Sequence, residues 1–288
     1  MTLTQLKYFL AVCTCGTVLA AAQYMHISQP SLSAAIKGLE DEFGVTLFKR
    51  GHRGMTLTPE GEVLYNMGRD LINRAEQTER VMNDLGSAKK TLRLGVPPMV
   101  GSLLLPRIFS EFVPQNPDIR LITSESGRHE LISKLTEDYV DMVLLPHTAS
   151  LEDELLSVHA ARFDLVCCVS KGSPLATKHS ISLTELENVP LILFNDGFFQ
   201  TEQIKHRFAS AYITPSVLLQ SDQLSTVISM VSSGTGVGFM FAELVKNSSD
   251  IVPLRLTEPM YADVSLAWKK HAYMKDAMRR MKEYIANT

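Results

Sequence analysis

The polar residues that follow Ile27 are the part of the sequence best suited to recognition chemistry. The stretch SQPSLS, residues 28–33, places three serine hydroxyls and a glutamine amide within six positions. Such groups donate and accept hydrogen bonds at short range, as the edges of DNA bases in the major groove require. The residues that we expect to contact DNA here are Ser28, Gln29, Pro30, Ser31, Ser33 and Lys37.

A helix has to present these residues, and the sequence predicts one that begins after Ser28 and ends at Gly44. Ser28 is a suitable N-cap, and Pro30 fits the first turn, where its missing N–H costs nothing. One side of the helix is apolar and runs through Leu32, Ile36, Leu39 and Phe43. The opposite side is small or polar, so the helix backbone can approach base edges in a groove about 12 Å wide. From periodicity alone, an ordinary surface helix is an equally good interpretation.

Two shorter helices are predicted before this one. Apolar residues recur at helical spacing from Leu6 to Cys13, and Gly16 ends that helix. An alanine-rich second helix follows over residues 17–25. Three short helices, the third with polar N-terminal residues, are the arrangement of a helix-turn-helix domain.

A basic hairpin, here called the wing, is predicted directly afterwards. The stretch LFKRGHRGMTLTPEG, residues 47–61, contains two strand-like runs around a turn bounded by glycines. Lys49, Arg50 and Arg53 lie in or beside this turn, and we expect them to bind phosphate groups. Residues 1–58 carry five lysines or arginines against three acidic residues, a net charge of +2, whereas the whole chain carries −3. The positive charge therefore gathers at the predicted DNA-binding domain, residues 1–58.

Between Gly16 and Arg50 the sequence resembles the winged helix-turn-helix of LysR-type transcriptional regulators. The match lies in an alanine pair and in Ser-Gln-Pro-x-Leu-Ser, Ile-x-x-Leu-Glu, Gly-Val-x-Leu-Phe-x-Arg and Leu-Thr-Pro-Glu-Gly. The resemblance implies a ligand-responsive regulator that binds double-stranded DNA sequence-specifically, and that contacts RNA polymerase if it activates transcription. Ala34 stands where this family commonly has arginine, so we expect an unusual operator affinity or sequence preference.

Residues 59–90 are predicted to form a linker made of one long helix and a short charged hinge. The helix begins at Pro59 and ends near Gly86. Residues spaced alternately three and four apart lie along one side of this helix, here called the seam: Leu64, Met67, Leu71, Arg74, Thr78, Val81 and Leu85. We interpret the seam as the contact between two linker helices, although a helix packed against its own domain also fits the pattern. The resemblance supports pairing and implies a homotetramer, a dimer of dimers.

Residues 91–288 alternate between strand-like and helical runs. LRLGV, IRLITSES and DMVLLP are predicted strands separated by helices over 103–112 and 129–138, which predicts a parallel βαβαβ sheet. DLVCCVS, LILFN, SVLLQS and GVGFM repeat the pattern with helices near 200–209 and 223–232. The fold class is therefore α/β overall: an all-α winged helix-turn-helix, a long linker helix and a two-lobed α/β effector domain. The resemblance implies that this domain is similar to periplasmic binding proteins.

Two lobes are expected within this effector domain. Lobe 1 comprises residues 91–161 and 266–288, and lobe 2 comprises residues 162–265. The final strand DVSLAW and a helix over 274–285 return the chain to lobe 1. The lobes leave a cleft between them, where ligands bind beyond the carboxyl ends of the parallel strands.

Three loops at these strand ends match the segments that line the effector cleft in the family. The effector-binding residues expected there are Pro97, Met99, Val100, Gly101, Ser102, Gly127, Arg128, His129, Phe198 and Phe199. Arg128 and His129 are expected to bind an anion, and the apolar residues to form the walls, so a small carboxylate with an apolar body is predicted. Alternatively, Arg128 is a solvated surface charge and the phenylalanines are core residues. Pro97 and Met99 stand where the family often has serine or threonine.

Enzymatic, metal and membrane functions have no support in this sequence. The segment SGTGVGF, residues 233–239, follows a helix and precedes a strand, the reverse of a dinucleotide-binding loop, and His129-Glu130 lacks a second histidine at position 133. We therefore expect no catalytic residues, no metal and no cofactor. A protein with a non-DNA partner, acting as an enzyme or a small-molecule binder, remains the alternative.

The cysteines and the hydropathy pattern indicate the cellular compartment of the protein. All four cysteines lie in apolar, regular stretches, which predicts reduced thiols rather than disulfides. Neither a leader sequence nor an apolar run of about 18 residues is present, so a soluble, cytoplasmic protein without a membrane partner is expected.

Overall fold

The structure is a computed structural model that describes residues 1–51, 54–86 and 90–288. Arg53 therefore lies outside the described residues, as do the side chains of Arg50, Val81 and Leu85. The chain forms two compact units, Met1–Gly86 and Ser87–Thr288.

The first unit has the helices and the hairpin that the sequence predicts. Its elements are α1 (Leu3–Cys15), α2 (Val18–Tyr24), α3 (Gln29–Phe43), β1 (Phe48–Gly51), β2 (Gly54–Leu57) and α4 (Pro59–Gly86). Leu6 and Phe9 of α1 and Leu32 and Leu39 of α3 are fully buried in its core. Gly44 ends α3 in the left-handed conformation with a φ of 67°, which glycine adopts without strain.

The wing is held against this core. Its strands pair antiparallel, with Phe48 opposite Leu57 and Gly51 opposite Gly54. The ring of Phe48 lies 5.2 Å from that of Phe9, and the Met55 N–H donates to the Gly16 carbonyl over 2.9 Å. The hairpin is therefore fixed to α1 and to the turn that follows it.

Two faces of the long helix α4 differ in burial. One face packs against α1: Ile72 is buried, Leu64 is partly buried against the same core, and Lys7 pairs with Glu76 over 3.0 Å. The other face leaves large apolar side chains exposed, at Val63, Met67, Leu71 and Met82. The predicted seam is thus corrected at one residue: Leu64 belongs to the inner face and Val63 takes its place on the outer one, while Met67 and Leu71 are exposed as expected. Because α4 serves its own core as well, neither interpretation of the helix excludes the other.

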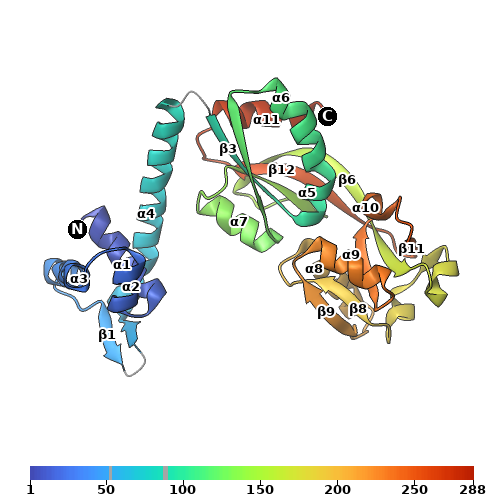
Figure 1. The fold of residues 1–288 in the computed structure, drawn as a ribbon, viewed down its shortest axis with the longest axis horizontal. Coiled ribbons are helices and arrows are strands. Elements are labelled where there is room, and N and C mark those ends of the chain that lie inside the picture. Colours follow the sequence, from blue (N-terminus) through green and yellow to red (C-terminus); the bar gives the residue numbers. More distant parts are fainter. Residues whose placement is uncertain (52–53, 87–89) are drawn as a thin grey trace. The chain divides into compact units, whose positions relative to one another are not determined.

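The second unit is built on one ten-stranded mixed sheet (Figure 1). Eight of the strands follow the order β4-β3-β5-β12-β6-β10-β8-β9, and the other two, β11 and β7, lie off this path, with β11 paired to β6 and β7. The strands are β3 (Lys90–Val96), β4 (Ile119–Glu125), β5 (Met142–His147), β6 (Leu155–Ser170), β7 (Ser180–Ile181), β8 (Leu191–Phe194), β9 (Val217–Ser221), β10 (Val237–Phe241), β11 (Ile251–Leu256) and β12 (Met260–Lys269). β3 is parallel to β4 and β5, and β8 is parallel to β9 and β10. The antiparallel pair β6 and β12 runs through both groups and joins them.

These two groups of strands define the lobes. Lobe 1 has β3, β4 and β5 with α5 (Pro98–Arg107), α7 (Arg128–Thr136) and α11 (Asp276–Ala286), and lobe 2 has β8, β9, β10 and β11 with α8 (Phe199–Ser210), α9 (Leu224–Ser232) and α10 (Ala242–Val245). α11 contacts β3 and β6, as expected for a chain that returns to lobe 1. On the crossing strands, Arg162 and Asp263 are opposite each other and form two hydrogen bonds of 2.7 and 2.8 Å.

Several boundaries differ from the sequence prediction. The helix expected over 103–112 begins earlier, at Pro98, and continues after α5 as a π-helix (Ile108–Phe112) and the short α6 (Val113–Gln115). Pro106 lies inside α5 and cannot donate a backbone hydrogen bond, and the wider turn follows directly after it. Strand β6 begins at Leu155 rather than at residue 164, because β12 pairs with it along that whole length.

Buried apolar side chains of both lobes form one large core cluster, and a second, smaller cluster lies around α7 and β5. Cys167 and Cys168 lie in the large cluster with no exposed surface, and burial raises the pKa of the Cys168 thiol to about 12. Burial likewise raises the pKa of the half-buried Cys13 to about 12. All four cysteines are free thiols.

Candidate functional site

The N-terminal half of α3 separates an apolar face from a polar one. Leu32, Ile36 and Leu39 are buried. All six residues expected on the DNA-contacting face are exposed: Ser28, Gln29, Pro30, Ser31, Ser33 and Lys37. The structure thus leaves all six residues accessible to another molecule.

The first two serines of this face, Ser28 and Ser31, also form the N-terminal cap of α3. The Ser28 hydroxyl accepts the Ser31 N–H over 3.2 Å, and the two hydroxyl oxygens lie 2.7 Å apart. In contrast, the side chains of Gln29, Ser33 and Lys37 have no hydrogen-bond or ion-pair partner among the described residues. Their polar groups are therefore available to another molecule. Lys49 of the wing is also exposed.

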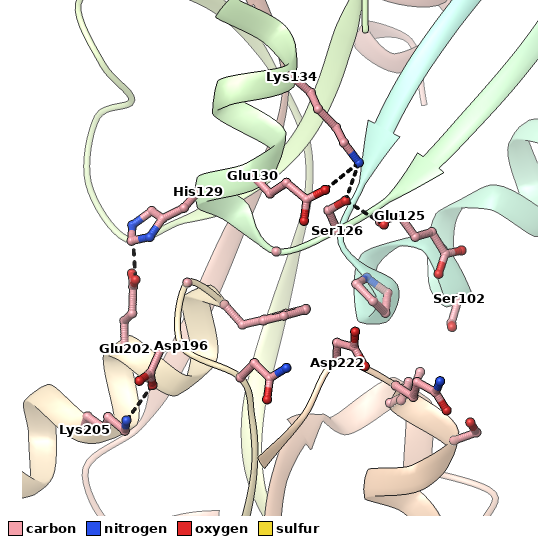
Figure 2. A pocket seen from close by; sticks show the side chains of 18 residues that line it. Ser102, Glu125, Ser126, His129, Glu130, Lys134, Asp196, Glu202, Lys205 and Asp222 are labelled. Atoms are coloured by element: carbon pink, nitrogen blue, oxygen red, sulfur yellow. Dashed lines mark hydrogen bonds and ion pairs between the residues drawn. The ribbon is translucent and has the colours of Figure 1, made fainter. Parts of the chain in front are cut away.

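A second candidate site is a cleft of about 1280 Å³ in the second unit (Figure 2). It lies beyond the carboxyl ends of β3, β4, β8 and β9, where the sequence predicts it. Its lining from lobe 1 is Pro98, Ser102, Glu125, Ser126, Gly127, His129, Glu130 and Lys134. Its lining from lobe 2 is Asn195, Asp196, Gly197, Phe198, Glu202, Lys205, Asp222, Gln223, Leu224 and Ser225.

The lobes contact each other on one side of the cleft. The His129 N–H donates to the Gly197 carbonyl over 3.4 Å, and the His129 ring nitrogen Nε2 lies 3.2 Å from Glu202 Oε1 (Figure 2). A Cβ atom on Gly127 would come within 3.0 Å of the Gly197 carbonyl and 3.1 Å of the Phe198 ring. Glycine at position 127 therefore permits this close approach of the two loops.

Both lysines of the cleft are engaged with neighbouring groups. Lys134 Nζ lies 2.8 Å from Glu130 Oε1 and donates to the Ser126 and Ser124 hydroxyls over 2.7 and 3.0 Å. Its hydrogen bond lowers the pKa of Glu130. Lys205 pairs with Asp196 over 2.5 Å, and this bond lowers the pKa of Asp196. The two ammonium groups thus hold carboxylates of the protein itself.

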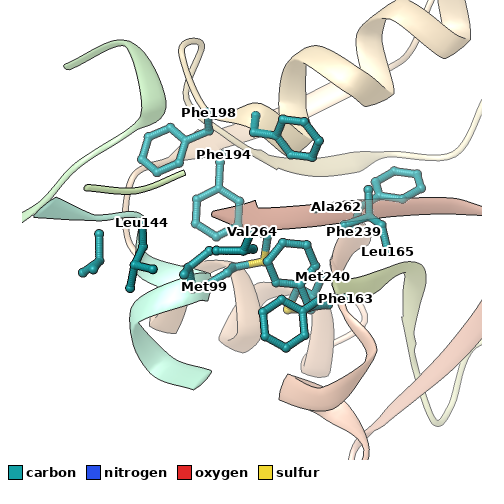
Figure 3. Packing of buried hydrophobic residues seen from close by; sticks show 14 of the residues in the cluster. Met99, Leu144, Phe163, Leu165, Phe194, Phe198, Phe239, Met240, Ala262 and Val264 are labelled. Carbon is teal, nitrogen blue, oxygen red and sulfur yellow. The ribbon is translucent and has the colours of Figure 1, made fainter. Parts of the chain in front are cut away.

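The structure gathers only part of the expected effector-binding set. Ser102, Gly127, His129 and Phe198 line the cleft, whereas Pro97, Met99, Val100, Gly101 and Phe199 are buried and do not line it. Figure 3 shows Met99 packed among core side chains that include Val264 and Phe194. The expectation that Met99, Val100 and Phe199 form walls of the cleft is thus wrong: in the first turns of α5 and α8 these side chains are buried in the core cluster.

Arg128 is also turned away from the cleft. Its guanidinium donates to Glu152 over 2.6 Å and to the Pro146 carbonyl over 3.1 Å, and only 16% of the side chain is exposed. It is neither the expected anion partner of the cleft nor a freely solvated charge. The carboxylate prediction therefore loses the arginine on which it depended.

The charged residues that do line the cleft were missed by the sequence prediction. Glu125, Glu130 and Lys134 come from the end of β4 and from α7, and Asp196, Glu202, Lys205 and Asp222 come from lobe 2. Only the four-residue spacing of Glu130 and Lys134 was a usable signal for a helical ion pair. The lobe 2 residues carry no pattern that ties them to α7.

Both units match models of known domains. Residues 3–62 match the bacterial regulatory helix-turn-helix of the lysR family, and residues 86–288 match the LysR substrate binding domain. The chain belongs to the LysR family. It is a transcriptional regulator with a DNA-binding helix-turn-helix and an effector-binding domain, as the sequence predicts.

Relatives and solved structures agree with this assignment to the LysR family. The chain is 27% identical to YwbI of Bacillus subtilis, an uncharacterized HTH-type transcriptional regulator, over 99% of this chain and 95% of that one. HinK of Pseudomonas aeruginosa, a LysR family transcriptional regulator, is 27% identical with a TM-score of 0.59, covering 99% of this chain and 97% of HinK. Full-length CbnR in complex with its target DNA has a TM-score of 0.72 at 20% identity, over 100% and 99% of the chains, and shows the fold alone.

No group of three or more histidine, cysteine or acidic side chains is placed to hold a metal ion in the part of the chain that the structure describes. No single helix in that part is long and apolar enough to cross a membrane, and α1 and α2 pass the test only as a pair bent by 117°.

Proposed function

We propose that the exposed face of α3 enters the major groove of operator DNA while the wing holds the phosphate backbone. Within α3, the groove-facing residues are Ser28, Gln29, Pro30, Ser31, Ser33 and Lys37. The phosphate-binding residues are Lys49, Arg50 and Arg53, of which only Lys49 has a described side chain. In this arrangement α3 selects the sequence and the wing supplies salt-dependent affinity.

The unpartnered polar groups of α3 are the observation that supports this role most directly. Gln29, Ser33 and Lys37 are exposed beside a fully packed apolar face, so their hydrogen bonds are unused within the protein. Short side chains at Ser33 and Ala34 leave the helix backbone accessible. An Ala34→Arg variant, which restores the residue common in the family, is expected to change operator affinity or sequence preference.

A binding titration with the DNA upstream of the gene tests the proposal. We expect affinity to fall steeply between about 50 and 200 mM salt, because phosphate contacts release counterions. Ser33→Glu places a carboxylate among phosphates and is expected to abolish specific binding while the fold persists. Ser229→Glu adds the same charge to the exposed surface of α9 and serves as the matched control. Unchanged operator affinity of Ser33→Glu in a gel-shift titration contradicts the groove assignment.

The cleft of the second unit is the proposed effector site. An effector that binds one arrangement of the lobes better than another shifts the population toward that arrangement. The paired α4 helices then carry the change to the DNA-binding domains, which makes DNA affinity and effector affinity mutually dependent. Ser102, Gly127, His129 and Phe198 are the expected effector-contacting residues that line the cleft.

The proposed assembly is a homotetramer, a dimer of dimers, formed through α4 pairs and through effector domains. Its support is the outer face of α4, where Val63, Met67, Leu71 and Met82 expose between 42 and 69% of their surface. Val63, Met67 and Leu71 are four residues apart and Met82 follows eleven residues, about three turns, later, so all four lie on one side of the helix. An exposed apolar stripe of this kind is typical of a helix that pairs with another. The regulator acts on DNA in the cytoplasm, without a membrane partner, and contacts RNA polymerase if it activates transcription.

A further inference from the structure

The sheet of the second unit narrows to two strands between the lobes. β5 of lobe 1 pairs with β12 from Asp263 onward, and β10 of lobe 2 pairs with β6 from Leu165 onward. Between these points, residues 163–164 of β6 and 261–262 of β12 have only each other as strand neighbours in the described part of the chain. This two-stranded segment is here called the neck. Because it is so narrow, a change in the relative position of the lobes has to alter its backbone.

The two faces of the neck differ in character. On one face Phe163 and Ala262 are buried in the core cluster (Figure 3). The other face is polar: Arg162 and Tyr261 are exposed, and Asp263 is half-buried. Side chains therefore join the two strands of the neck in two ways, by core packing on one face and by polar contacts on the other.

The Arg162 side chain contacts β12 at both ends of the neck. Its Nε and Nη2 atoms donate to the two carboxylate oxygens of Asp263 over 2.7 and 2.8 Å, at the end toward lobe 1. Its guanidinium carbon lies 4.4 Å from the centre of the Tyr261 ring, at the end toward lobe 2. Asp263 is directly opposite Arg162, and Tyr261 is its diagonal neighbour, which long and aromatic side chains can reach.

This cluster of Arg162, Asp263 and Tyr261 fits one twist of the neck. A guanidinium is planar, so it keeps two parallel hydrogen bonds to a carboxylate and its place over a ring only while the strands hold their present orientation. The hydrogen bonds from Arg162 also lower the pKa of Asp263, which keeps this carboxylate ionised at neutral pH. A rotation of one lobe against the other thus has to break part of the cluster.

A β-bulge lies directly beside the cluster, on the side toward lobe 1. Val264 is opposite Ala161, but Ser265 is opposite His159, so β6 has one extra residue at Ala160. Bulges bend a strand and increase its local twist. The cluster therefore lies where the two strands already depart from regular pairing, and where a change of twist meets the least resistance from the ladder.

We propose that Arg162 is a positioning residue for the effector response, and that its contacts with Asp263 and Tyr261 hold the neck at the twist that brings the lobes together. This inference rests on the proposed effector function of the cleft. In the arrangement that it favours, the His129 N–H donates to the Gly197 carbonyl across the cleft. Loss of the cluster shifts the population toward separated lobes. The cluster thereby sets part of the bias that an effector has to reinforce or overcome.

Hydrogen–deuterium exchange of the His129 amide in the full chain tests this inference. His129 lies in the first turn of α7, where an N–H has no partner within the helix. Its partner is the Gly197 carbonyl of lobe 2 over 3.4 Å, so its exchange rate follows the population in which the lobes have separated. The amides of Leu94 and Leu144, in buried strands of lobe 1, report on unfolding of the whole unit instead. Mass spectrometry with peptide fragmentation resolves these amides.

Two variants remove the paired hydrogen bonds with little change in size, Arg162→Gln and Asp263→Asn. We expect each to speed His129 exchange about fivefold, the effect of an ion pair that is exposed but has ideal two-bond geometry, and to leave the amides of Leu94 and Leu144 at the parent rate. The double variant is expected to exchange no faster than either single one, because both residues belong to one interaction.

The matched control is Arg107→Gln, which removes two hydrogen bonds to Glu111 of 3.0 and 3.1 Å within lobe 1. Tyr261→Phe keeps a ring beside the guanidinium and is the second control. Both controls are expected to leave His129 exchange unchanged. An acceleration in Arg107→Gln as large as in Arg162→Gln would show that any lost surface ion pair has this effect, and would overturn the inference.

The remaining outcomes separate this inference from the proposed function. Unchanged His129 exchange in both neck variants overturns the inference, and so does an equal acceleration at Leu94 and Leu144, which would mean that the cluster only stabilises the fold. The exchange experiment needs neither DNA nor effector. Operator binding without the His129 response therefore refutes the role of Arg162 alone, whereas the response in a chain that binds no operator refutes the regulator function alone.

Discussion

The junction between the wing and α4 leaves no room for a side chain at Gly61. A Cβ atom there would lie 2.2 Å from the Leu47 carbonyl oxygen and 3.0 Å from a methyl group of Leu57. The carbonyl cannot easily withdraw, because it accepts the Thr58 N–H over 3.0 Å and the Thr58 hydroxyl over 3.2 Å. The Thr58 hydroxyl in turn accepts the Gly61 N–H over 3.0 Å. One methyl group at this position must therefore displace the start of α4 from the hairpin.

Gly61→Ala is expected to destabilise the DNA-binding unit by about 2 kcal/mol. Overpacking against backbone costs about 3 kcal/mol, and the higher helix propensity of alanine returns about 1 kcal/mol. For a unit of this size, about 2 kcal/mol lowers the melting temperature by about 10 °C. We expect operator binding to weaken as well, because the wing and the linker helix share this contact.

Differential scanning calorimetry of the full chain measures this change, with Gly86→Ala as the control. Gly86 lies in the same helix, and a Cβ atom there meets nothing within 4 Å. The control variant is therefore expected to be as stable as the parent or slightly more so. Equal melting temperatures for Gly61→Ala and Gly86→Ala would refute the steric reasoning.

Two further predictions concern assembly and pH. Met67→Lys puts a charge on the exposed apolar face of α4 and is expected to weaken self-association at least tenfold. Analytical ultracentrifugation measures this change, and an unchanged mass distribution would exclude this face from the dimer interface. Asp276→Asn is expected to cost about 1 kcal/mol at neutral pH, since the hydrogen bond from Lys90 and the nearby arginines lower the Asp276 pKa to about 2. A carboxyl group whose pKa is lower in the folded chain than in the unfolded chain stabilises the fold at pH values above its unfolded pKa, and this stabilisation is lost as the pH falls toward 2. In urea unfolding, the difference in free energy of unfolding between the parent and Asp276→Asn should therefore vanish near pH 2. A difference that persists at pH 2 contradicts the ion-pair explanation.

Local patterns allowed much of this fold to be predicted. The alternation of buried Leu32, Ile36 and Leu39 with exposed polar residues on α3 follows from the 3.6-residue period of the helix, which needs only neighbouring residues. Strands β5, β8 and β10 are buried along almost their whole length and appear as continuous apolar runs. Of the described residues of the predicted seam on α4, Met67 and Leu71 are exposed as expected and only Leu64 belongs to the inner face. The pattern does not distinguish the face that packs against α1 from the face left open.

The cleft shows where such patterns stop being informative. Arg128 and His129 are adjacent in the sequence, yet Arg128 is held by Glu152 in its own lobe while His129 reaches Glu202 in the other. Met99 and Ser102 lie three residues apart in α5, and one is core while the other lines the cleft. Which side chain of a loop or first helical turn faces a cavity depends on the direction in which the whole element leaves the sheet.

The sequence by itself determined the class of the protein, the helices of its DNA-binding domain and the strand ends at which a ligand would bind. Only the tertiary structure decided which charged side chains line the cleft. Glu125 and Asp222 are separated by nearly a hundred residues and lie at the ends of β4 and β9, at opposite ends of the strand order, yet both line one cavity. Electrostatic energy depends on distance in space, which the order of residues along a chain does not specify.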